Sequence, residues 1–497
     1  MKNIVELVKS PWTSDWHQQA EKIFSNFLQE GERYLKKARN VTSIRSPKIT
    51  LEENGGVPYF ALIHPSNAPS GPYGGMSFVL FPSQEKASLI SLGIGTQGLA
   101  PDENVLGRPG HARKLSAICK LLNQKYGNQH RVAWAKKDPC RTDLPMPQDV
   151  RTDFNDEHYQ RTFDRYGNVL YAIVDVSSFN DDAIAEVLKL FLDLMFEERG
   201  VPIKASCVKD AEKAKQEYLS CLLPDVSKDD VVALLKQRRY VIIEGPPGTG
   251  KTRLAQEISN DSEKYAASKC VQFHPNMTYE QFIGGLFPES VAGSELGFAF
   301  RPHMGILMES VKECSKLKAQ QNFLLHIDEI NRADLAKVLG ESIILLEPNS
   351  EYRREIGLNF NFGEPINDKL SVPDNLHILG TMNSADRSIA ILDIAIRRRF
   401  AFVQLYPQMN VVNKLGCEIT KNAFTKLLTI FIEHAFDDSF KLMPGHSYFI
   451  TPDGIDGKTK LMTELKPLLE EYLEQGYVAG FDDELRSYIQ WLEVICE

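Results

Sequence analysis

The sequence has no apolar run long enough to cross a bilayer. Its longest apolar stretch, 187–196, is interrupted by Lys189 and Asp193, whereas a membrane-spanning helix needs about 20 mostly apolar residues. The first residues also lack an apolar core followed by a small-residue cleavage site, so we expect no signal peptide. We therefore expect a cytoplasmic protein without a membrane partner.

Closely spaced cysteines are also missing. The 8 cysteines are scattered along 497 residues, and no two of them form a Cys-x-x-Cys pair. This distribution argues against a disulfide scaffold and against a structural zinc site. Hydrophobic residues make up 43% of the chain and charged residues 25%, as in ordinary folded domains. A chain of this length is expected to form two or three domains.

Positive charge is scarce overall but unevenly spread. The net charge is −9, yet residues 1–150 carry a net charge of +6 and residues 151–200 carry −6. A basic N-terminal region is compatible with contact to DNA phosphates. It is equally compatible with an ordinary solvated surface.

The texture of the sequence divides it into four segments. Residues 1–200 contain short β-type runs between Pro, Gly, Ser and Asn turns, together with amphipathic helices, and predict an α+β domain. Residues 201–224 predict a polar linker helix. Residues 225–405 alternate strands with helices, which predicts a mostly parallel sheet, and residues 406–497 predict a helical lid.

A glycine-rich loop follows the apolar segment 240–244. Its spacing, G-x-x-x-x-G-K-T, is that of a phosphate-binding loop between a strand and a helix. The glycines let backbone N–H groups approach the phosphates, and the helix N-terminus adds positive potential. We expect Lys251 to contact the β- and γ-phosphates. The predicted nucleotide-binding residues of the loop are Gly245, Pro246, Pro247, Gly248, Thr249, Gly250, Lys251 and Thr252.

A second apolar segment, 323–329, ends in two acids. We expect Asp328 and the Thr252 hydroxyl to hold Mg²⁺, and Glu329 to polarise the attacking water. An isolated strand ending in two acids is often only a solvated turn. Its combination with the phosphate loop predicts a nucleoside triphosphatase with an α/β P-loop core.

A third cluster lies at 377–400. Asn383 ends a predicted strand, where its side chain can reach the γ-phosphate or its attacking water. The predicted helix 390–396 leads to three arginines, 397–399. They fit a solvated, DNA-contacting or ion-paired helix end, but their position favours fingers that enter the site of a neighbouring subunit. That reading requires a ring.

The chain resembles a known family through motifs that occur in the right order. These are GPPGTGKT (245–252), FHPNMTYEQFIGG (273–285), HIDEINRADLAKVLGESIILLEP (326–348), GTMNSADRS (380–388), AIRRRF (395–400) and GHSYF (445–449). Together they resemble the AAA+ domain of McrB-like motors of modification-dependent restriction systems, over about 240–475. Less securely, PDENVLGRPGHARK (101–114) resembles a domain that often precedes such motors.

The resemblance implies a preference for GTP over ATP, a hexameric ring and a separate McrC-like nuclease subunit. Arg398 and Arg399 match the positions of the family's trans-acting arginines. Asp386 is expected at the nucleotide site. Met382–Asp386 superficially resembles a guanine-reading Asn-Lys-x-Asp motif, but we prefer the sensor role for Asn383. His446 and Ser447 fit a nucleotide-sensing contact or a helix-capping pair, and we assign them no role.

The N-terminal domain is the expected reader of DNA, which the resemblance implies to be modified. Arg113, Lys114, Lys136 and Lys137 are candidate phosphate contacts. Candidates for stacking on a flipped base are Trp12, Trp16, Tyr59, Tyr73 and Trp134. The domain has no acidic pair followed by Glu-x-Lys, so we expect cleavage to need the partner.

Two other functions remain open from the sequence. One is a MoxR-like remodeller that uses ATP to reshape a protein. The other is a nucleotide-gated DNA sensor that does not translocate DNA.

Overall fold

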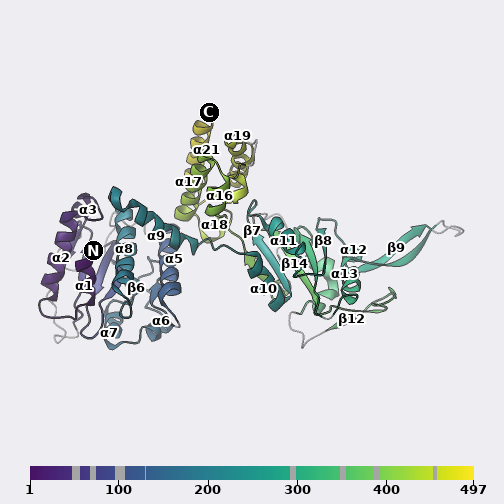
Figure 1. The fold of residues 1–497 in the computed structure, drawn as a ribbon, viewed down its shortest axis with the longest axis horizontal. Coiled ribbons are helices and arrows are strands. Elements are labelled where there is room, and N and C mark those ends of the chain that lie inside the picture. The colour runs from purple at the N-terminus through teal and green to yellow at the C-terminus, as the bar shows by residue number, and fades with distance from the viewer. Residues whose placement is uncertain are drawn as a thin grey trace. The chain divides into compact units, whose positions relative to one another are not determined.

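The computed structural model describes residues 1–47, 56–67, 74–95, 107–128, 130–290, 298–318, 320–347, 354–385, 392–451 and 456–497. The chain forms two compact units (Figure 1). Unit 1 comprises Met1–Leu222 and Thr429–Phe436, and unit 2 comprises Leu223–Leu428 and Asp437–Glu497.

Unit 1 is built on a six-stranded sheet in which neighbouring strands are antiparallel. The order is β1-β2-β3-β4-β6-β5. The strands are β1 (Ser43–Arg45), β2 (Phe60–Ile63), β3 (Met76–Phe81), β4 (Leu89–Ile94), β5 (Ala133–Ala135) and β6 (Leu170–Val174). Every residue of β2, β3, β4 and β6 is buried. Their continuous rather than alternating apolar runs are explained by side chains packing on both faces of the sheet.

Helices cover both faces of this sheet. They are α1 (Lys2–Lys9), α2 (Trp16–Glu30), α3 (Lys37–Asn40), α5 (Pro109–Tyr126), α6 (Gln148–Asp153), α7 (Glu157–Tyr166), α8 (Asp181–Glu198) and α9 (Val208–Ser220). Residues of α1, α2, α5 and α8 form one core cluster with the sheet, and residues of α6 and α7 form another. The amphipathic helices expected within residues 1–200 are present, α5 and α8 being the longest.

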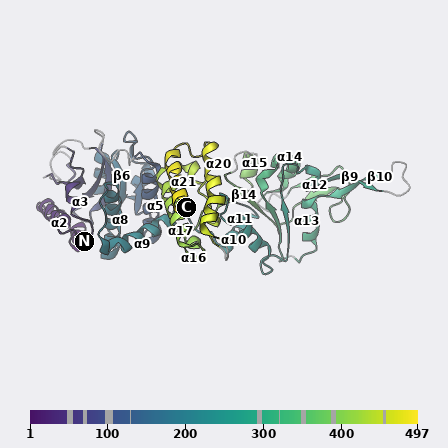
Figure 2. The ribbon, with the colours of Figure 1, turned by 90° about the horizontal axis from the view of Figure 1, so that it is seen from above.

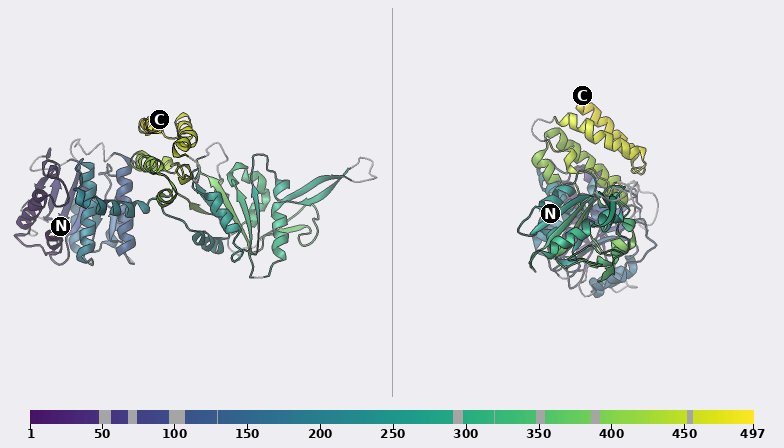
Figure 3. Two further views of the ribbon diagram at one scale, coloured as in Figure 1. Left: turned by 45° about the horizontal axis from the view of Figure 1, so that its top comes forward. Right: turned by 90° about the vertical axis from the view of Figure 1, so that its right-hand side faces the viewer.

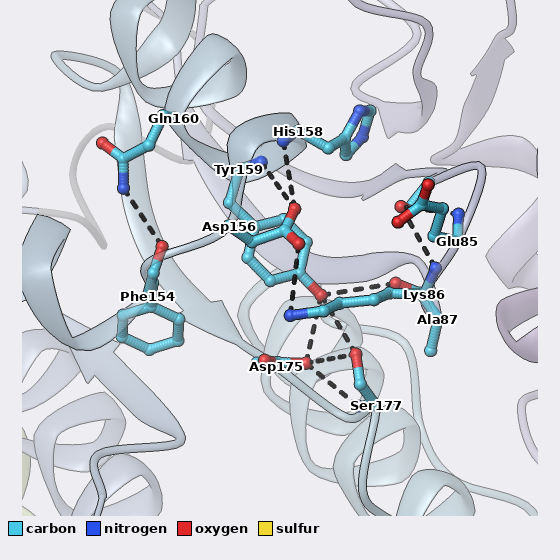
Figure 4. Close-up of polar contacts among 11 residues, drawn as sticks. Glu85, Lys86, Ala87, Phe154, Asp156, His158, Tyr159, Gln160, Asp175 and Ser177 are labelled. Carbon is cyan, nitrogen blue, oxygen red and sulfur yellow. Dashed lines mark hydrogen bonds and ion pairs between the residues drawn. The ribbon is translucent and has the colours of Figure 1, made fainter.

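A polar cluster fixes the start of α7 (Figure 4). The Asp156 carboxylate accepts hydrogen bonds from the backbone N–H groups of His158 and Tyr159, at 3.0 and 3.3 Å. It also pairs with Lys86 at 3.2 Å. The buried Tyr159 hydroxyl donates to Asp175 at 3.0 Å, beyond the end of β6. These bonds explain how a short polar helix is held against the sheet.

Unit 2 contains a five-stranded parallel sheet in the order β15-β7-β14-β11-β8. The strands are β7 (Tyr240–Gly245), β8 (Ala267–Gln272), β11 (Phe323–Asp328), β14 (Leu376–Asn383) and β15 (Ala401–Gln404). The helices along this part of the chain are α10 (Lys228–Arg238), α11 (Lys251–Ser259), α12 (Tyr279–Phe282), α13 (Ile306–Ser315), α14 (Leu335–Leu339) and α15 (Ile394–Arg397). The predicted parallel sheet is therefore present.

Two hairpins are added to this core. The longer one, β9 (Gly284–Ser290) with β10 (Phe298–Met304), projects from the rest of unit 2 (Figure 2). The shorter one pairs β12 (Glu355–Gly357) with β13 (Lys369–Ser371).

The C-terminal region is helical (Figure 3). Its helices are α16 (Met409–Leu415), α17 (Glu418–His434), α18 (Asp437–Phe440), α19 (Gly457–Lys460), α20 (Lys466–Glu474) and α21 (Asp482–Cys496). A π-helical turn, Leu461–Leu465, lies between α19 and α20. Part of α17 belongs to unit 1, a division that the sequence did not predict.

Candidate nucleotide site

The loop 245–252 connects β7 to α11, as its spacing predicted. Gly248 and Gly250 have φ angles of 80° and 83°, a region that residues with a Cβ adopt only at a steric cost. The Thr249 hydroxyl donates to the Pro246 carbonyl at 2.9 Å and closes the loop on itself. Lys251 and Thr252 begin α11, so the helix N-terminus faces the loop.

Lys251 lies inside this loop and is buried. Its Nζ donates hydrogen bonds to the Gly245 and Pro246 carbonyls at 2.9 and 2.8 Å. Burial lowers the pKa of Lys251 to about 8, against the opposing effect of Glu329 and Asp328. The ammonium is thus desolvated in advance, which strengthens its attraction for a phosphate.

Sheet topology brings the other predicted residues to the same edge. Strand β14 lies between β7 and β11, with Asn383 paired to Gly245 and Ile327 paired to Gly380. The carboxyl ends of these three parallel strands therefore meet. Three segments that are distant in sequence therefore converge at one site: the phosphate loop, the acids 328–329 and Asn383.

Two threonines hold the first acid. Asp328 Oδ1 accepts a hydrogen bond from the Thr252 hydroxyl at 3.0 Å and another from the Thr381 hydroxyl. The backbone N–H of Glu329 donates to Thr381 Oγ1 at 3.1 Å. Thr381 was not predicted at the site, although it lies two residues before Asn383 on β14 and residues so spaced share one face of a sheet.

Glu329 has an unusual backbone conformation. Its φ and ψ angles are 53° and 47°, in the left-handed region that non-glycine residues rarely occupy. Within the described part of the chain, Glu329 Oε2 is buried and makes no hydrogen bond. Arg332 Nε lies 3.5 Å from it. Residues held in sparsely populated conformations often cluster at functional sites, where surrounding bonds maintain them.

Asn383 lies at the end of β14 as predicted. Its Oδ1 accepts a hydrogen bond from the Ala385 N–H at 3.2 Å. Asn331 is buried beside it and donates through Nδ2 to the Asn383 carbonyl at 3.4 Å. Asp386, also predicted at the site, lies outside the described residues.

The two predicted finger arginines differ in their surroundings. The Arg399 side chain is 3% exposed, lies 3.3 Å from Glu347 Oε1 and donates to the Ala395 carbonyl at 2.9 Å. The Arg398 side chain is 64% exposed and lies 3.9 Å from the same carboxylate. Arg399 therefore matches the ion-paired alternative, whereas Arg398 is accessible to a neighbouring molecule.

The lid segment 445–449 contacts the phosphate loop directly. The Gly445 N–H donates to the Pro247 carbonyl at 2.9 Å, and the Ser447 N–H donates to the Gly248 carbonyl at 3.0 Å. Burial lowers the pKa of His446, whose Nδ1 lies 3.4 Å from the Gln408 N–H. The sequence left this segment without a role, but its backbone is part of the site.

Most of the predicted DNA-binding residues of unit 1 form ion pairs or hydrogen bonds with other groups of the protein. Lys114 is 1% exposed and pairs with Glu198 at 2.6 Å and Glu433 at 2.9 Å. Arg113 is also buried and donates to the Ile432 carbonyl at 2.7 Å, within unit 1. This placement argues against Arg113 and Lys114 as phosphate contacts, because their charges face protein groups and not solvent.

The remaining candidates of unit 1 are more varied. Lys136 Nζ donates to three carbonyls, those of Arg141, Leu144 and Asn168, and only Lys137 is an exposed cation of the four. Trp16 and Tyr59 are buried in the core, whereas Trp12 and Trp134 are half-buried. Tyr73 lies outside the described residues.

The residues present fit a magnesium site of the kind that a bound nucleotide completes. In the described part of the chain, no group of three or more His, Cys, Asp or Glu side chains is arranged to hold a metal ion by itself. Mg²⁺ typically uses one or two protein oxygens together with waters and substrate phosphates. The Thr252 hydroxyl and the Asp328 carboxylate, 3.0 Å apart, supply such oxygens.

Comparison with known proteins agrees with this geometry. Residues 240–400 match the AAA domain family, dynein-related subfamily. The "Type IV methyl-directed restriction enzyme EcoKMcrB subunit" of Escherichia coli (strain K12) is 31% identical over 284 residues, 50% of this chain and 57% of that protein. Residues 240–400 are thus similar to an AAA domain, and half of the chain is similar to an McrB subunit.

A second relative is also a restriction component. The "Type II restriction enzyme BsuMI component YdiS" of Bacillus subtilis (strain 168) is 33% identical over 201 residues, 34% of this chain and 57% of that protein. The chain thus spans little more than half the length of the curated relatives it matches. The fold is an AAA+ P-loop domain with an α+β region before it, as expected. Within the described residues, no helix meets the length and apolarity that a bilayer crossing requires.

Proposed function

We propose that this chain hydrolyses GTP and is the motor subunit of a modification-dependent restriction system. The convergence of Lys251, Asp328 and Glu329 at one edge of a parallel sheet carries the proposal, because phosphate binding, metal binding and water activation need these groups together. Similarity to two restriction-system proteins supports the biological setting. A cytoplasmic location fits that role.

Each residue has a distinct task in this proposal. The N–H groups of the loop and the start of α11 bind the phosphates, and Lys251 neutralises their charge. Thr252 and Asp328 hold Mg²⁺, which supplies further charge neutralisation at the phosphate oxygens when it is bound. Glu329 polarises the attacking water, and Asn383 orients the water or the γ-phosphate.

The remaining parts require partners. The exposed Arg398 reaches the nucleotide of a neighbouring copy in a hexameric ring, where a finger is worth a factor of about 10³–10⁵ in rate. Unit 1 contacts modified DNA, and Lys137 is the remaining exposed cation among the candidates. An McrC-like nuclease subunit cuts the DNA, because the N-terminal domain of this chain has no acidic pair followed by Glu-x-Lys.

The decisive experiment compares hydrolysis of GTP and ATP by the purified chain, with and without methylated DNA. We expect turnover of GTP to exceed that of ATP, and Glu329→Gln to retain nucleotide binding while losing hydrolysis. A preference for ATP would contradict the proposal and favour an ATP-driven protein remodeller. DNA-stimulated turnover without movement along DNA would favour a nucleotide-gated sensor.

DNA binding has its own test. We expect the full chain to bind a methylated duplex, and Lys137→Glu to weaken binding and lower the slope of log K against log salt by about 1 or more. Glu85→Gln, an exposed change elsewhere on unit 1, is the control. Equal affinity and equal slope in both variants would remove Lys137 from the interface.

A further inference from the structure

We infer that Thr381 is a positioning residue that aligns the magnesium carboxylate and the water-activating carboxylate through one hydroxyl group. The inference rests on the proposed nucleotide hydrolysis and adds a residue to it. Thr381 is 1% exposed and lies on β14, the strand between those that carry the phosphate loop and the two acids.

The Thr381 hydroxyl has both of its hydrogen-bonding roles occupied, by Asp328 at the end of β11 and by Glu329 directly after it. As a donor it bonds to Asp328 Oδ1. As an acceptor it receives the backbone N–H of Glu329 at 3.1 Å. A hydroxyl carries a single donor hydrogen, so this one proton is assigned to Asp328. The two acids are consecutive in sequence. The Thr381 hydroxyl oxygen holds the side chain of Asp328 and the backbone of Glu329.

The hydrogen bond from Thr381 to Asp328 determines which carboxylate oxygen of Asp328 is left to bind a metal ion. Oδ1 already accepts hydrogen bonds from both Thr252 and Thr381. These two donors come from different elements, Thr252 from α11 and Thr381 from β14. They lock its rotation, so the carboxylate is oriented before any metal arrives. Preorganisation of this kind avoids the loss of side-chain freedom on binding.

The bond to Glu329 restrains its backbone. Glu329 has a φ of 53°, which a residue with a Cβ adopts only when its surroundings maintain it. Its side chain makes no hydrogen bond through Oε2 within the described residues, and its ion-pair partner Arg332 is 3.5 Å away and exposed, so the side chain restrains the backbone only weakly. The N–H bond to Thr381 is therefore a restraint that aims the Glu329 carboxylate.

One consequence separates this role from simple packing. Removing the hydroxyl should weaken Mg²⁺ binding and slow the chemical step together, because the same oxygen serves both acids. Loss of Glu329 itself should affect the chemical step alone. Nucleotide binding without Mg²⁺ should change little, because the Lys251 ammonium is held by the Gly245 and Pro246 carbonyls and not by Thr381.

The test uses Thr381→Val, which keeps the branched shape but lacks the hydroxyl, and Thr381→Ser, which restores the hydroxyl. Ser310→Ala, which removes another buried hydroxyl of unit 2, is the matched control. For each full-length variant we would measure kcat, the Mg²⁺ concentration giving half-maximal affinity for a fluorescent GTP analogue, and hydrogen exchange of the peptide containing Glu329.

We expect Thr381→Val to lower kcat about 10- to 100-fold and to raise the half-saturating Mg²⁺ concentration several-fold, as for loss of a buried bond to a charged group. Exchange at Glu329 should accelerate. Thr381→Ser should recover most of each property, and Ser310→Ala should match the parent in kcat and Mg²⁺ dependence.

Two results would overturn the inference. One is parental Mg²⁺ dependence and exchange in a folded Thr381→Val protein. The other is equal damage in the valine and serine variants, which would assign the effect to packing. A parent protein that hydrolyses no nucleotide would instead refute the proposed function, while the exchange measurement would still report on Thr381.

Discussion

Gly445 of the lid lies directly against Gly248 of the phosphate loop. A Cβ placed on Gly445 would fall 2.0 Å from the Gly248 carbonyl carbon and 2.3 Å from the Thr249 nitrogen. Atoms at such distances overlap, so the two backbones touch with no space for a side chain. The lid and the loop are therefore fitted to each other at the nucleotide site.

Gly445→Ala should consequently damage nucleotide binding. The added methyl group meets backbone atoms, which cannot move aside as a flexible side chain can, so the loop must shift. We expect nucleotide affinity to fall at least about 10-fold, the equivalent of about 1.4 kcal/mol. Isothermal titration with GTP would measure it. Gly357→Ala, where nothing lies within 4 Å of the added atom, should bind as the parent does.

Lys251→Ala should abolish binding of the triphosphate while preserving the fold. The change removes the one buried ammonium of the loop and frees the Gly245 and Pro246 carbonyls that it bonds. Fluorescent-nucleotide titration and circular dichroism of the same sample would test both parts. Parental affinity in a folded variant would show that the phosphates bind elsewhere.

Arg398 and Arg399 should fail in different ways. Arg398→Ala should fold normally yet lose turnover, and mixing it with Lys251→Ala subunits should restore part of the activity because each supplies what the other lacks. Arg399→Ala removes a buried ion pair with Glu347, so it should lower stability by about 3 kcal/mol. Turnover of mixed samples and denaturant unfolding separate the two effects. Absence of any complementation would contradict the finger role of Arg398.

Unit 1 should lose stability in acid. Burial, assisted by the charge of Lys114, lowers the pKa of His111 to about 3, whereas the unfolded side chain titrates near 6.5. Below about pH 6.5, His111 becomes protonated in the unfolded chain but stays neutral in the folded chain. The free energy of unfolding therefore falls as the pH falls. At pH 5 the loss from this residue is about 2 kcal/mol.

The test of this prediction is denaturant unfolding at pH 7.5 and pH 5. His111→Gln should reduce the difference in unfolding free energy between the two pH values. Tyr171→Phe removes the hydroxyl 2.7 Å from His111 Nδ1 but keeps the histidine, so it should retain the pH dependence. An unchanged difference in the glutamine variant would assign the acid sensitivity to other groups.

Much of the nucleotide site could be predicted because its signals are local. The loop spacing, the strand before it and the acids at 328–329 each occupy a short stretch of sequence. The alternation of strands and helices then predicted a parallel sheet, in which strand ends meet at one edge. The role of each residue in these segments stays a prediction, although the structure brings the described ones together.

The remaining features depend on contacts between distant segments. The sequence alone predicts Lys114 as an exposed cation of an amphipathic helix. The structure shows it paired with Glu198 and Glu433, which are far from it in sequence. Arg398 and Arg399 are consecutive and identical in type, and both lie near Glu347, but the side chain of Arg399 is 3% exposed and that of Arg398 is 64% exposed. Gly445 has no local signal at all, because its constraint comes from the loop almost two hundred residues earlier.

The strand order of unit 2 also constrains how the protein is made. Among the described strands, β7 pairs with β14 and β15 alone, and both follow it by more than a hundred residues. A nascent chain that has left the ribosome as far as Asp328 holds the complete phosphate loop but not the strand that joins it to the acids. Until that strand emerges, the apolar strands of the nascent chain have edges whose backbone groups are unpaired, and such edges associate readily with other chains. Synthesis of this protein should therefore depend on chaperones until residue 404 has emerged.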